Sequence, residues 1–99
     1  MEVQAERFDN LHMGMSPKEV RDIFPKVHKA SEFSTGSITV AEYRFRDGTA
    51  PRPGSPAGNF DRIPHYIWFY FVDDRLVEWN EDPVDYKGNP DIIVEWRER

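Results

Sequence analysis

The stretch that decides the fold reads IPHYIWFYFVDDRLVEW and occupies residues 63–79. Two runs rich in β-branched and aromatic residues, 63–72 and 75–79, flank the acidic pair Asp73-Asp74. Such runs on either side of a short polar turn are typical of a β-hairpin. We therefore expect two antiparallel strands here, with the rest of the chain arranged around them.

The register of this hairpin determines which side chains are buried, because a slip of one residue moves every side chain to the other face. A two-residue loop at Asp73-Asp74 puts Phe69 opposite Glu78. A three-residue loop that includes Val72 puts Phe69 opposite Val77, and we favour it because it gathers apolar side chains on one face. It predicts one face made of Ile67, Phe69, Val77 and Trp79 and an opposite face made of Tyr66, Trp68, Tyr70 and Glu78. It also requires a left-handed backbone at Asp74, which aspartate tolerates better than most residues.

The composition narrows the class of protein. A chain of 99 residues can bury one modest core, and its 14% of aromatic residues can supply much of it. The mean hydropathy of −0.74 and the absence of a long apolar run exclude a transmembrane helix. The net charge of −5 argues against nonspecific binding to nucleic acid, which needs a cationic surface.

The chain contains no cysteine, which excludes disulfides, thiolate metal sites and thiol nucleophiles. Residues 1–7 are polar, lack the apolar centre of a signal peptide, and are expected to fray. Either the protein is cytoplasmic, or a leader ahead of Met1 has been removed and it acts in the periplasm or at the outer membrane. The sequence leaves both localisations open.

The clearest local signal outside the hairpin lies at residues 14–24. Ser16 is a good N-cap, Pro17 suits the first helical position, and Glu19 completes a capping box. The apolar residues that follow are spaced to form one helical stripe, namely Val20, Ile23 and Phe24. Pro25 ends the helix. We expect a helix of about two turns that packs on the sheet, since it would be marginal alone.

Between the helix and the hairpin, residues 26–36 read as a connector with Val27 and Phe33 as candidate anchors. Residues 38–46 have the composition of a strand with Tyr43 and Phe45 facing inward. The apolar alternation in this strand changes phase near Val40-Ala41, which indicates either pairing that starts late or a bulge.

Residues 47–62 are rich in proline and glycine, with Phe60 as the only large apolar residue. This composition predicts a long mobile loop, either functional or disordered, and disorder is favoured because the side chains are small. At the other end of the chain, Asn89-Pro90 followed by Ile92, Ile93 and Trp96 favours a short closing helix. Residues 92–94 are also strand-like, so an extra strand stays open.

These elements predict a single α+β domain over residues 1–99. A short N-terminal helix packs on a small antiparallel sheet of about three strands, and the C-terminal segment adds a short helix or another strand.

Residues 14–21, Gly-Met-Ser-Pro-Lys-Glu-Val-Arg, resemble the opening "G-M-S/T-x-x-x-V" helix of the SmpA/OmlA (BamE-like) outer-membrane assembly lipoproteins. Residues 68–77 look like the last hairpin of that family, with Asp74 where a turn glycine is usual. The β-lactamase-inhibitor-protein-like domains look related in fold. The likeness spans about residues 8–79, although Phe24-Pro25 replaces a Gly-x-Pro and the lipid-attachment cysteine has no counterpart. It implies an α+β fold and a lipoprotein of the bacterial cell envelope.

The sequence contains no recognisable catalytic motif. His12, His28 and His65 are widely separated, without the spacing of metal ligands. The acidic residues at 73–74 and 81–85 fit turns better than paired acid–base groups or a calcium loop. No serine lies in a nucleophile elbow and no glycine-rich loop resembles a phosphate site. We therefore expect no enzyme activity, no metal and no cofactor.

The best functional candidate is the face that carries Tyr66, Trp68 and Tyr70. An open face of this kind offers rigid amphipathic anchors for another protein, whereas a C-terminal segment folded over it would give those side chains a structural role. The two alternatives are evenly balanced.

The favoured function is accordingly a non-enzymatic protein–protein interaction module, in the cell envelope if the resemblance holds. One alternative is a cytosolic acidic inhibitor or immunity-type protein whose carboxylates cover a basic site on a target enzyme. Another is a small ligand-binding protein or enzyme, which needs a concave pocket with convergent polar groups. The identity of the partner and the oligomeric state are left open.

Overall fold

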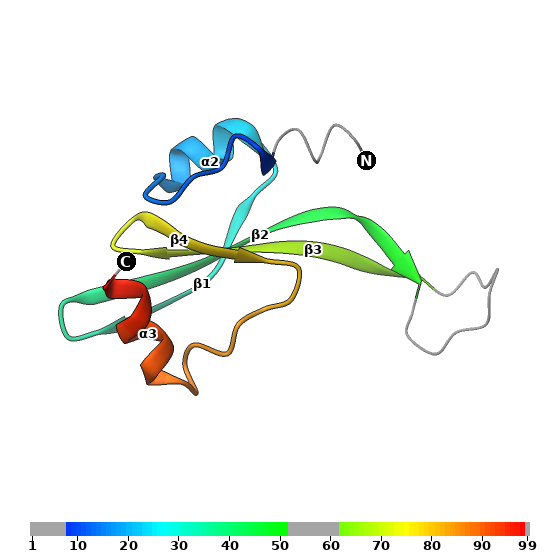
Figure 1. Cartoon of the computed structure of the whole chain (residues 1–99). Helices are drawn as coiled ribbons and strands as arrows, with labels where there is room; N and C mark the ends of the chain where they lie inside the picture. The colour runs from blue at the N-terminus through cyan, green and yellow to red at the C-terminus, as the bar shows by residue number, and fades with distance from the viewer. Residues whose placement is uncertain (1–7, 52–61, 99) are drawn as a thin grey trace.

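A computed structural model describes residues 8–51 and 62–98, and it consists of one antiparallel sheet between two helices (Figure 1). The elements follow in the order α2 (Pro17–Ile23), β1 (His28–Thr35), β2 (Ile38–Pro51), β3 (Arg62–Val72), β4 (Arg75–Asn80) and α3 (Pro90–Arg97). The strand order is β1-β2-β3-β4. The α+β class is confirmed, with four strands where about three were expected, and the closing segment is a helix.

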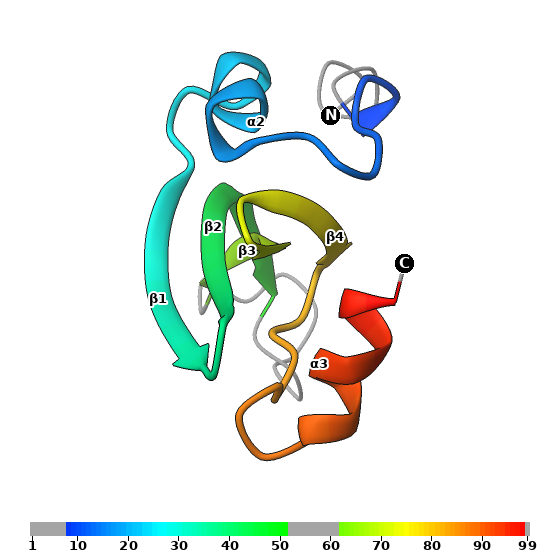
Figure 2. The same cartoon turned by 90° about the vertical axis from the view of Figure 1, so that its left-hand side faces the viewer.

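The two helices lie on opposite faces of the sheet, so each face has its own core (Figure 2). The α2 side is built around Phe24, whose ring centre lies 4.9 Å from that of Phe45 and 5.6 Å from that of Phe69. The α3 side gathers Tyr70, Tyr86 and Trp96, among others. A sheet that is apolar on both faces buries more surface than one helix could cover.

The start of α2 forms as its sequence predicts. The backbone N–H of Glu19 donates to Ser16 Oγ at 3.2 Å, and the backbone N–H of Ser16 donates to Glu19 Oε1 at 3.1 Å. This reciprocal capping box satisfies two amides that a helix start leaves without partners. The N–H of Ser16, and then its hydroxyl, hold the pKa of Glu19 below its ordinary value. Val20 and Phe24 are fully buried against the sheet.

The register of the β3–β4 hairpin differs from the one we favoured. The loop contains two residues, Asp73 and Asp74, and Phe71 pairs with Leu76. The pairing then shifts, so that Tyr70 opposes Glu78 and Val77 is the extra residue of a β-bulge.

The bulge moves one residue, Val77, from one predicted face to the other. Phe69 lies opposite Trp79 rather than Val77, and Val77 joins Tyr70 on the α3 side. The placements of Ile67, Phe69 and Trp79 on the other face are confirmed. The bulge is favoured because it puts two apolar pairs, Phe71 with Leu76 and Phe69 with Trp79, on the same face of the sheet. A regular ladder that pairs Phe71 with Leu76 would instead place Phe69 opposite Glu78. The left-handed backbone at Asp74 is also confirmed, with φ of 65°.

Strand β2 is regular at Val40-Ala41, so the bulge or late pairing expected there was wrong. Val40 and Ala41 pair in sequence with β1 on one side and with β3 on the other. The apparent change of phase is ordinary alternation in a strand buried on both faces: Val40 packs on the α3 side, while Tyr43 and Phe45 pack on the α2 side as predicted.

Two segments expected to be irregular contain strand residues. The predicted connector 26–36 contains β1, an edge strand whose side chains are mostly exposed, and Val27 and Phe33 do anchor it. At the two ends of the predicted loop 47–62, β2 continues through Pro51 and β3 begins at Arg62. The loop predicted between them, over residues 52–61, lies outside the described residues. The expectations for residues 1–7 and for Phe60 lie outside the described residues.

Candidate functional site

The three aromatic residues singled out from the sequence do share one face of β3, but they differ in burial. Tyr70 is fully buried beneath α3, where its ring stacks on Trp96 with centres 5.2 Å apart and planes 26° apart. Tyr66 and Trp68 are only half-buried. The closing helix therefore covers the inner part of this face and leaves its outer part accessible.

The hydroxyl of Tyr70 is part of the fold rather than a free group. It donates to Glu42 Oε2 at 2.9 Å and accepts from the backbone N–H of Val84 at 2.6 Å. Nearby, the hydroxyls of Tyr86 and Ser31 lie 2.9 Å apart. Burial raises the pKa of both phenols. These bonds fasten the segment before α3 to the sheet, so Tyr70 is unavailable to a partner.

The accessible part of the face is completed by Arg44, which the sequence had not singled out. Its guanidinium carbon lies 4.7 Å from the ring centre of Tyr66 and 5.8 Å from that of Trp68. The two rings are themselves 6.0 Å apart. Arg44 lies directly opposite Trp68 in the ladder between β2 and β3. We refer to Arg44, Tyr66 and Trp68 as the aromatic–arginine surface.

His28 holds Arg44 from the other side. It is the register partner of Arg44 on β1, and Arg44 Nε donates to His28 Nε2 at 3.1 Å. The arginine is thus fixed between a histidine and two aromatic rings. The sequence did contain a sign that Arg44 joins this surface. Glu42, Arg44 and Arg46 alternate along β2, and this alternation places Arg44 on the same face of the sheet as its ladder partner Trp68.

The other titratable candidates are dispersed. His12 Nδ1 lies 3.2 Å from the carbonyl oxygen of Met13, and His65 Nδ1 lies 3.8 Å from Asp47 Oδ2. Within residues 8–51 and 62–98, no three histidine, aspartate or glutamate side chains gather closely enough to hold a metal ion. Asp73 Oδ1 accepts from the backbone N–H of Thr39 at 3.0 Å, and Asp85 Oδ1 accepts from that of Gly88 at 3.1 Å. The local bond of Asp85 stabilises its turn, as the sequence indicates, whereas the carboxylate of Asp73 joins the hairpin turn to β2.

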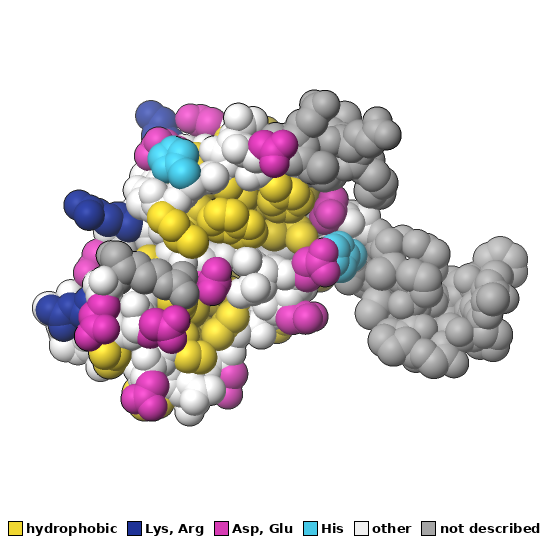
Figure 3. Space-filling model, in the orientation of Figure 1, with side chains coloured by type: hydrophobic (Ala, Val, Ile, Leu, Met, Phe, Trp, Pro, Cys, Tyr) yellow, Lys and Arg dark blue, Asp and Glu magenta, His cyan; other side chains and the backbone are white. Residues whose placement is uncertain are grey.

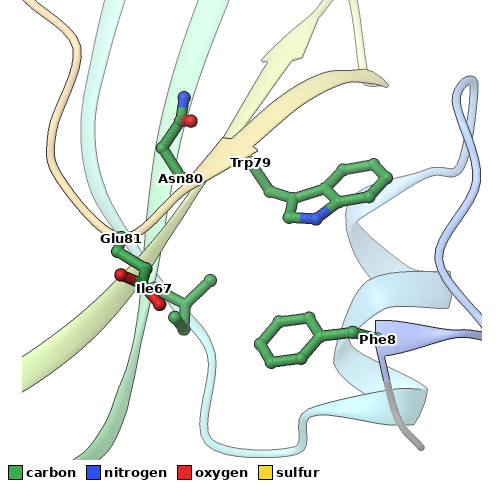
Figure 4. A pocket seen from close by; sticks show the side chains of 5 residues that line it. All are labelled: Phe8, Ile67, Trp79, Asn80 and Glu81. Atoms are coloured by element: carbon green, nitrogen blue, oxygen red, sulfur yellow. The ribbon is translucent and has the colours of Figure 1, made fainter. Parts of the chain in front are cut away.

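Two of the cavities at the surface lie near opposite ends of β4. The smaller, about 300 Å³, is an apolar groove lined by Phe8, Ile67 and Trp79 with Asn80 and Glu81 at its edge (Figure 4). Hydrophobic side chains form a band between the α2 layer and the sheet on the face seen in Figure 3. The larger, about 550 Å³, lies at the opposite end of β4, where the hairpin turn approaches the end of α3.

No family model, no curated protein and no solved structure matches this chain. None of the helices in the described part of the chain is long and apolar enough to cross a membrane.

Proposed function

We propose that this chain is a non-enzymatic protein-binding module that contacts its partner through the aromatic–arginine surface. The observation that carries this proposal is the clustering of Arg44, Tyr66 and Trp68 within 6 Å of one another on the part of the sheet that α3 leaves accessible. Tryptophan, tyrosine and arginine are the residue types enriched at the energetic centres of protein interfaces.

The fixed geometry of the cluster supports the proposal. A side chain that is ordered before binding loses less conformational entropy when a partner arrives. Arg44 is ordered in this way, since it stacks on two rings and donates to His28. The aromatic rings stand on β3, the strand that pairs with β2 along most of its length. The surface is therefore presented on a rigid part of the molecule.

The non-enzymatic part of the proposal is supported by where the polar side chains are used. Glu42 and Tyr70 bond to each other, Ser31 bonds to Tyr86, and Asp73 and Asp85 bond to backbone amides. Following the resemblance described above, we propose the bacterial cell envelope as the compartment in which the module works.

A partner-capture experiment with matched variants tests the proposal. Wild type, the double variant Tyr66→Ala/Trp68→Ala and the control Val94→Ala are used as baits in envelope and cytosolic fractions, with quantitative mass spectrometry as the readout. Val94 is 53% exposed on α3, so its variant removes an apolar surface side chain elsewhere. We expect a protein captured by wild type and control to be depleted at least about tenfold with the double variant.

A third variant separates the stacked geometry from simple positive charge. Arg44→Lys keeps the charge but loses the planar group that lies over Tyr66 and Trp68. We expect it to weaken capture of the same protein. Equal capture by a double variant with a native circular dichroism spectrum would overturn the proposal, and enrichment in the cytosolic fraction alone would overturn the envelope assignment.

A further inference from the structure

The cleft of about 550 Å³ at the turn end of β4 is not used by the aromatic–arginine surface. Three parts of the chain form its walls: the segment at Met13-Gly14, the β3–β4 hairpin, and the last turn of α3. They meet at the end of the sheet that carries the hairpin turn (Figure 1). Its volume lies in the range of about 300–1,000 Å³ typical of sites for small molecules.

Each wall of this cleft is fixed by contacts within the fold. The backbone N–H of Gly14 donates to the carbonyl of Leu76 at 2.8 Å, and the N–H of Leu76 donates to the carbonyl of Met15 at 2.7 Å. On the other side, Trp96 is held by its stacking on Tyr70. The cleft is therefore formed before any ligand arrives.

The same hydrogen bonds argue against an extended peptide as the occupant. A peptide that adds to a sheet edge needs free backbone groups on the edge strand. At Leu76 both groups are already bonded to the chain's own Gly14 and Met15. A compact ligand that needs no strand pairing suits the site better.

Two arginines and one aspartate line the cleft, so positive charge is in excess there. Arg75 and Arg97 both line it and are exposed, and within the residues that the structure describes neither is in an ion pair. Asp73 also lines the cleft, but its carboxylate is engaged by the amide of Thr39. Two arginines at one cleft of a chain with a net charge of −5 favour an anionic ligand, and carboxylates match the guanidinium fork.

The remaining lining is apolar. Met13 is 51% exposed at the rim, and Val77 and Trp96 contribute to the wall. A methionine side chain adapts readily to the shape of an apolar group. We propose that this cleft binds a small carboxylic acid with an apolar body, the carboxylate at Arg75 and Arg97 and the body against Met13 and Trp96.

The test is a titration of the ¹⁵N-labelled full chain with 4-phenylbutyrate, followed by two-dimensional NMR. We expect saturable shifts at the amides of Gly14 and Val77 and at the indole N–H of Trp96. The neutral isostere 4-phenylbutanol keeps the apolar body but cannot pair with arginine. We expect it to bind at least about tenfold more weakly.

Variants assign the binding to the two arginines. Arg75→Gln and Arg97→Gln should each weaken 4-phenylbutyrate about tenfold, because each removes one charged contact. Arg21→Gln removes an exposed arginine from α2 and should leave the affinity unchanged. The Tyr66→Ala/Trp68→Ala variant should also bind normally, which keeps this result independent of the protein-binding proposal.

Three results would overturn the proposal. The first is the absence of saturable shifts up to about 10 mM ligand, which would leave less than about 3 kcal/mol of binding free energy. The second is equal affinity for the acid and the alcohol. The third is a shift pattern or a variant response located away from the cleft, with Arg75→Gln and Arg97→Gln behaving as wild type.

Discussion

Two neighbouring aspartates form the turn of the central hairpin, each in a conformation that favours glycine. Asp73 has φ of 49° and Asp74 has φ of 65°. Two-residue hairpin loops of this kind need positive φ at both positions, and the second is most often glycine. The side chain of Asp73 accepts a hydrogen bond from the amide of Thr39, whereas within residues 8–51 and 62–98 the side chain of Asp74 accepts none. The turn therefore retains strain at Asp74.

Replacing Asp74 with glycine should stabilise the protein. We expect the free energy of unfolding to rise by about 0.5–1 kcal/mol, since the relief of left-handed strain exceeds the entropy that glycine adds to the unfolded chain. Asp73→Gly relieves similar strain but loses the bond to Thr39, so it should stabilise less or destabilise. Urea denaturation of both variants measures this, and a lower midpoint for Asp74→Gly than for Asp73→Gly would contradict it.

The buried phenol of Tyr70 should make the protein sensitive to alkaline pH. Desolvation by burial, chiefly, raises the pKa of Tyr70 above its ordinary value of 10.0. Above pH 10 the unfolded chain therefore loses this proton while the folded chain keeps it, and the unfolded state then binds fewer protons. The contribution of Tyr70 to the free energy of unfolding is therefore fully present below pH 10. It falls as the pH rises from 10 toward the raised pKa of Tyr70 in the folded protein.

The variant Tyr70→Phe isolates this contribution. It should cost about 1–3 kcal/mol at pH 8, because it leaves Glu42 and the amide of Val84 without the hydroxyl. Between pH 8 and pH 10.5 its stability should fall less than that of wild type. Part of the fall should persist, since the pKa of Tyr86 is also raised. Guanidinium denaturation at the two pH values is the measurement, and parallel losses in both proteins would refute the assignment.

The candidate site was only partly predictable from its residues. Alternation along β3 correctly placed Tyr66, Trp68 and Tyr70 on one face. Whether these side chains are exposed depends on where α3 packs, and no local sequence pattern encodes that. In the structure α3 packs over Tyr70 and buries it. Arg44 was missed because its role arises from pairing with Trp68 on a neighbouring strand.

Helix α3 packs on one face of the sheet and forms the second core with it. Ile93 and Trp96 are 5% and 3% exposed, and they pack with Tyr70 and Val77. Asn89 stands at the N-cap position but makes no side-chain capping bond. With eight residues and no cap, α3 would be marginal alone and depends on its apolar face.

Truncating Trp96 should therefore destabilise the whole protein. We expect Trp96→Ala to cost about 3–5 kcal/mol, the loss typical of a large buried aromatic side chain. Val94, 53% exposed on the same helix, is the matched control, and Val94→Ala should change stability by less than about 0.5 kcal/mol. Chemical denaturation compares the two. Similar midpoints would mean that α3 is only loosely attached to the sheet.

Elements with strong local signals were predicted, and those defined by pairing were not. The capping box located α2, and the apolar spacing located α3. Strand β1 was missed because an edge strand can be polar, and His28–Thr35 contributes little apolar surface. The bulge at Val77 was missed because it depends on two pairs at once, Phe71 with Leu76 and Phe69 with Trp79. Strand pairing and bulges depend on residues far apart in the chain, so local patterns in a single sequence do not predict them.

In the molecule as a whole, the central strands belong to both cores, and β3 contributes large aromatic side chains to each. Phe69 packs on the α2 side and its neighbour Tyr70 packs on the α3 side, and both are fully buried. Neither helix can keep its contacts if β3 detaches from its neighbours. The two faces should therefore unfold together as a single cooperative unit.

Phe69→Ala tests this coupling. The ring centre of Phe69 lies 5.6 Å from that of Phe24 on the α2 side. Loss of this side chain should lower the free energy of unfolding by about 3–5 kcal/mol, out of the roughly 5–15 kcal/mol typical of a whole domain. Native-state hydrogen exchange should show equal loss of protection at the amides of Phe24, beside α2, and Trp96, in α3, although only the first lies near the substitution. Trp68→Ala, on a half-buried side chain, should reduce both by a smaller amount. If protection at Phe24 falls while protection at Trp96 is unchanged, the two faces open separately, and β3 does not join them into one folding unit.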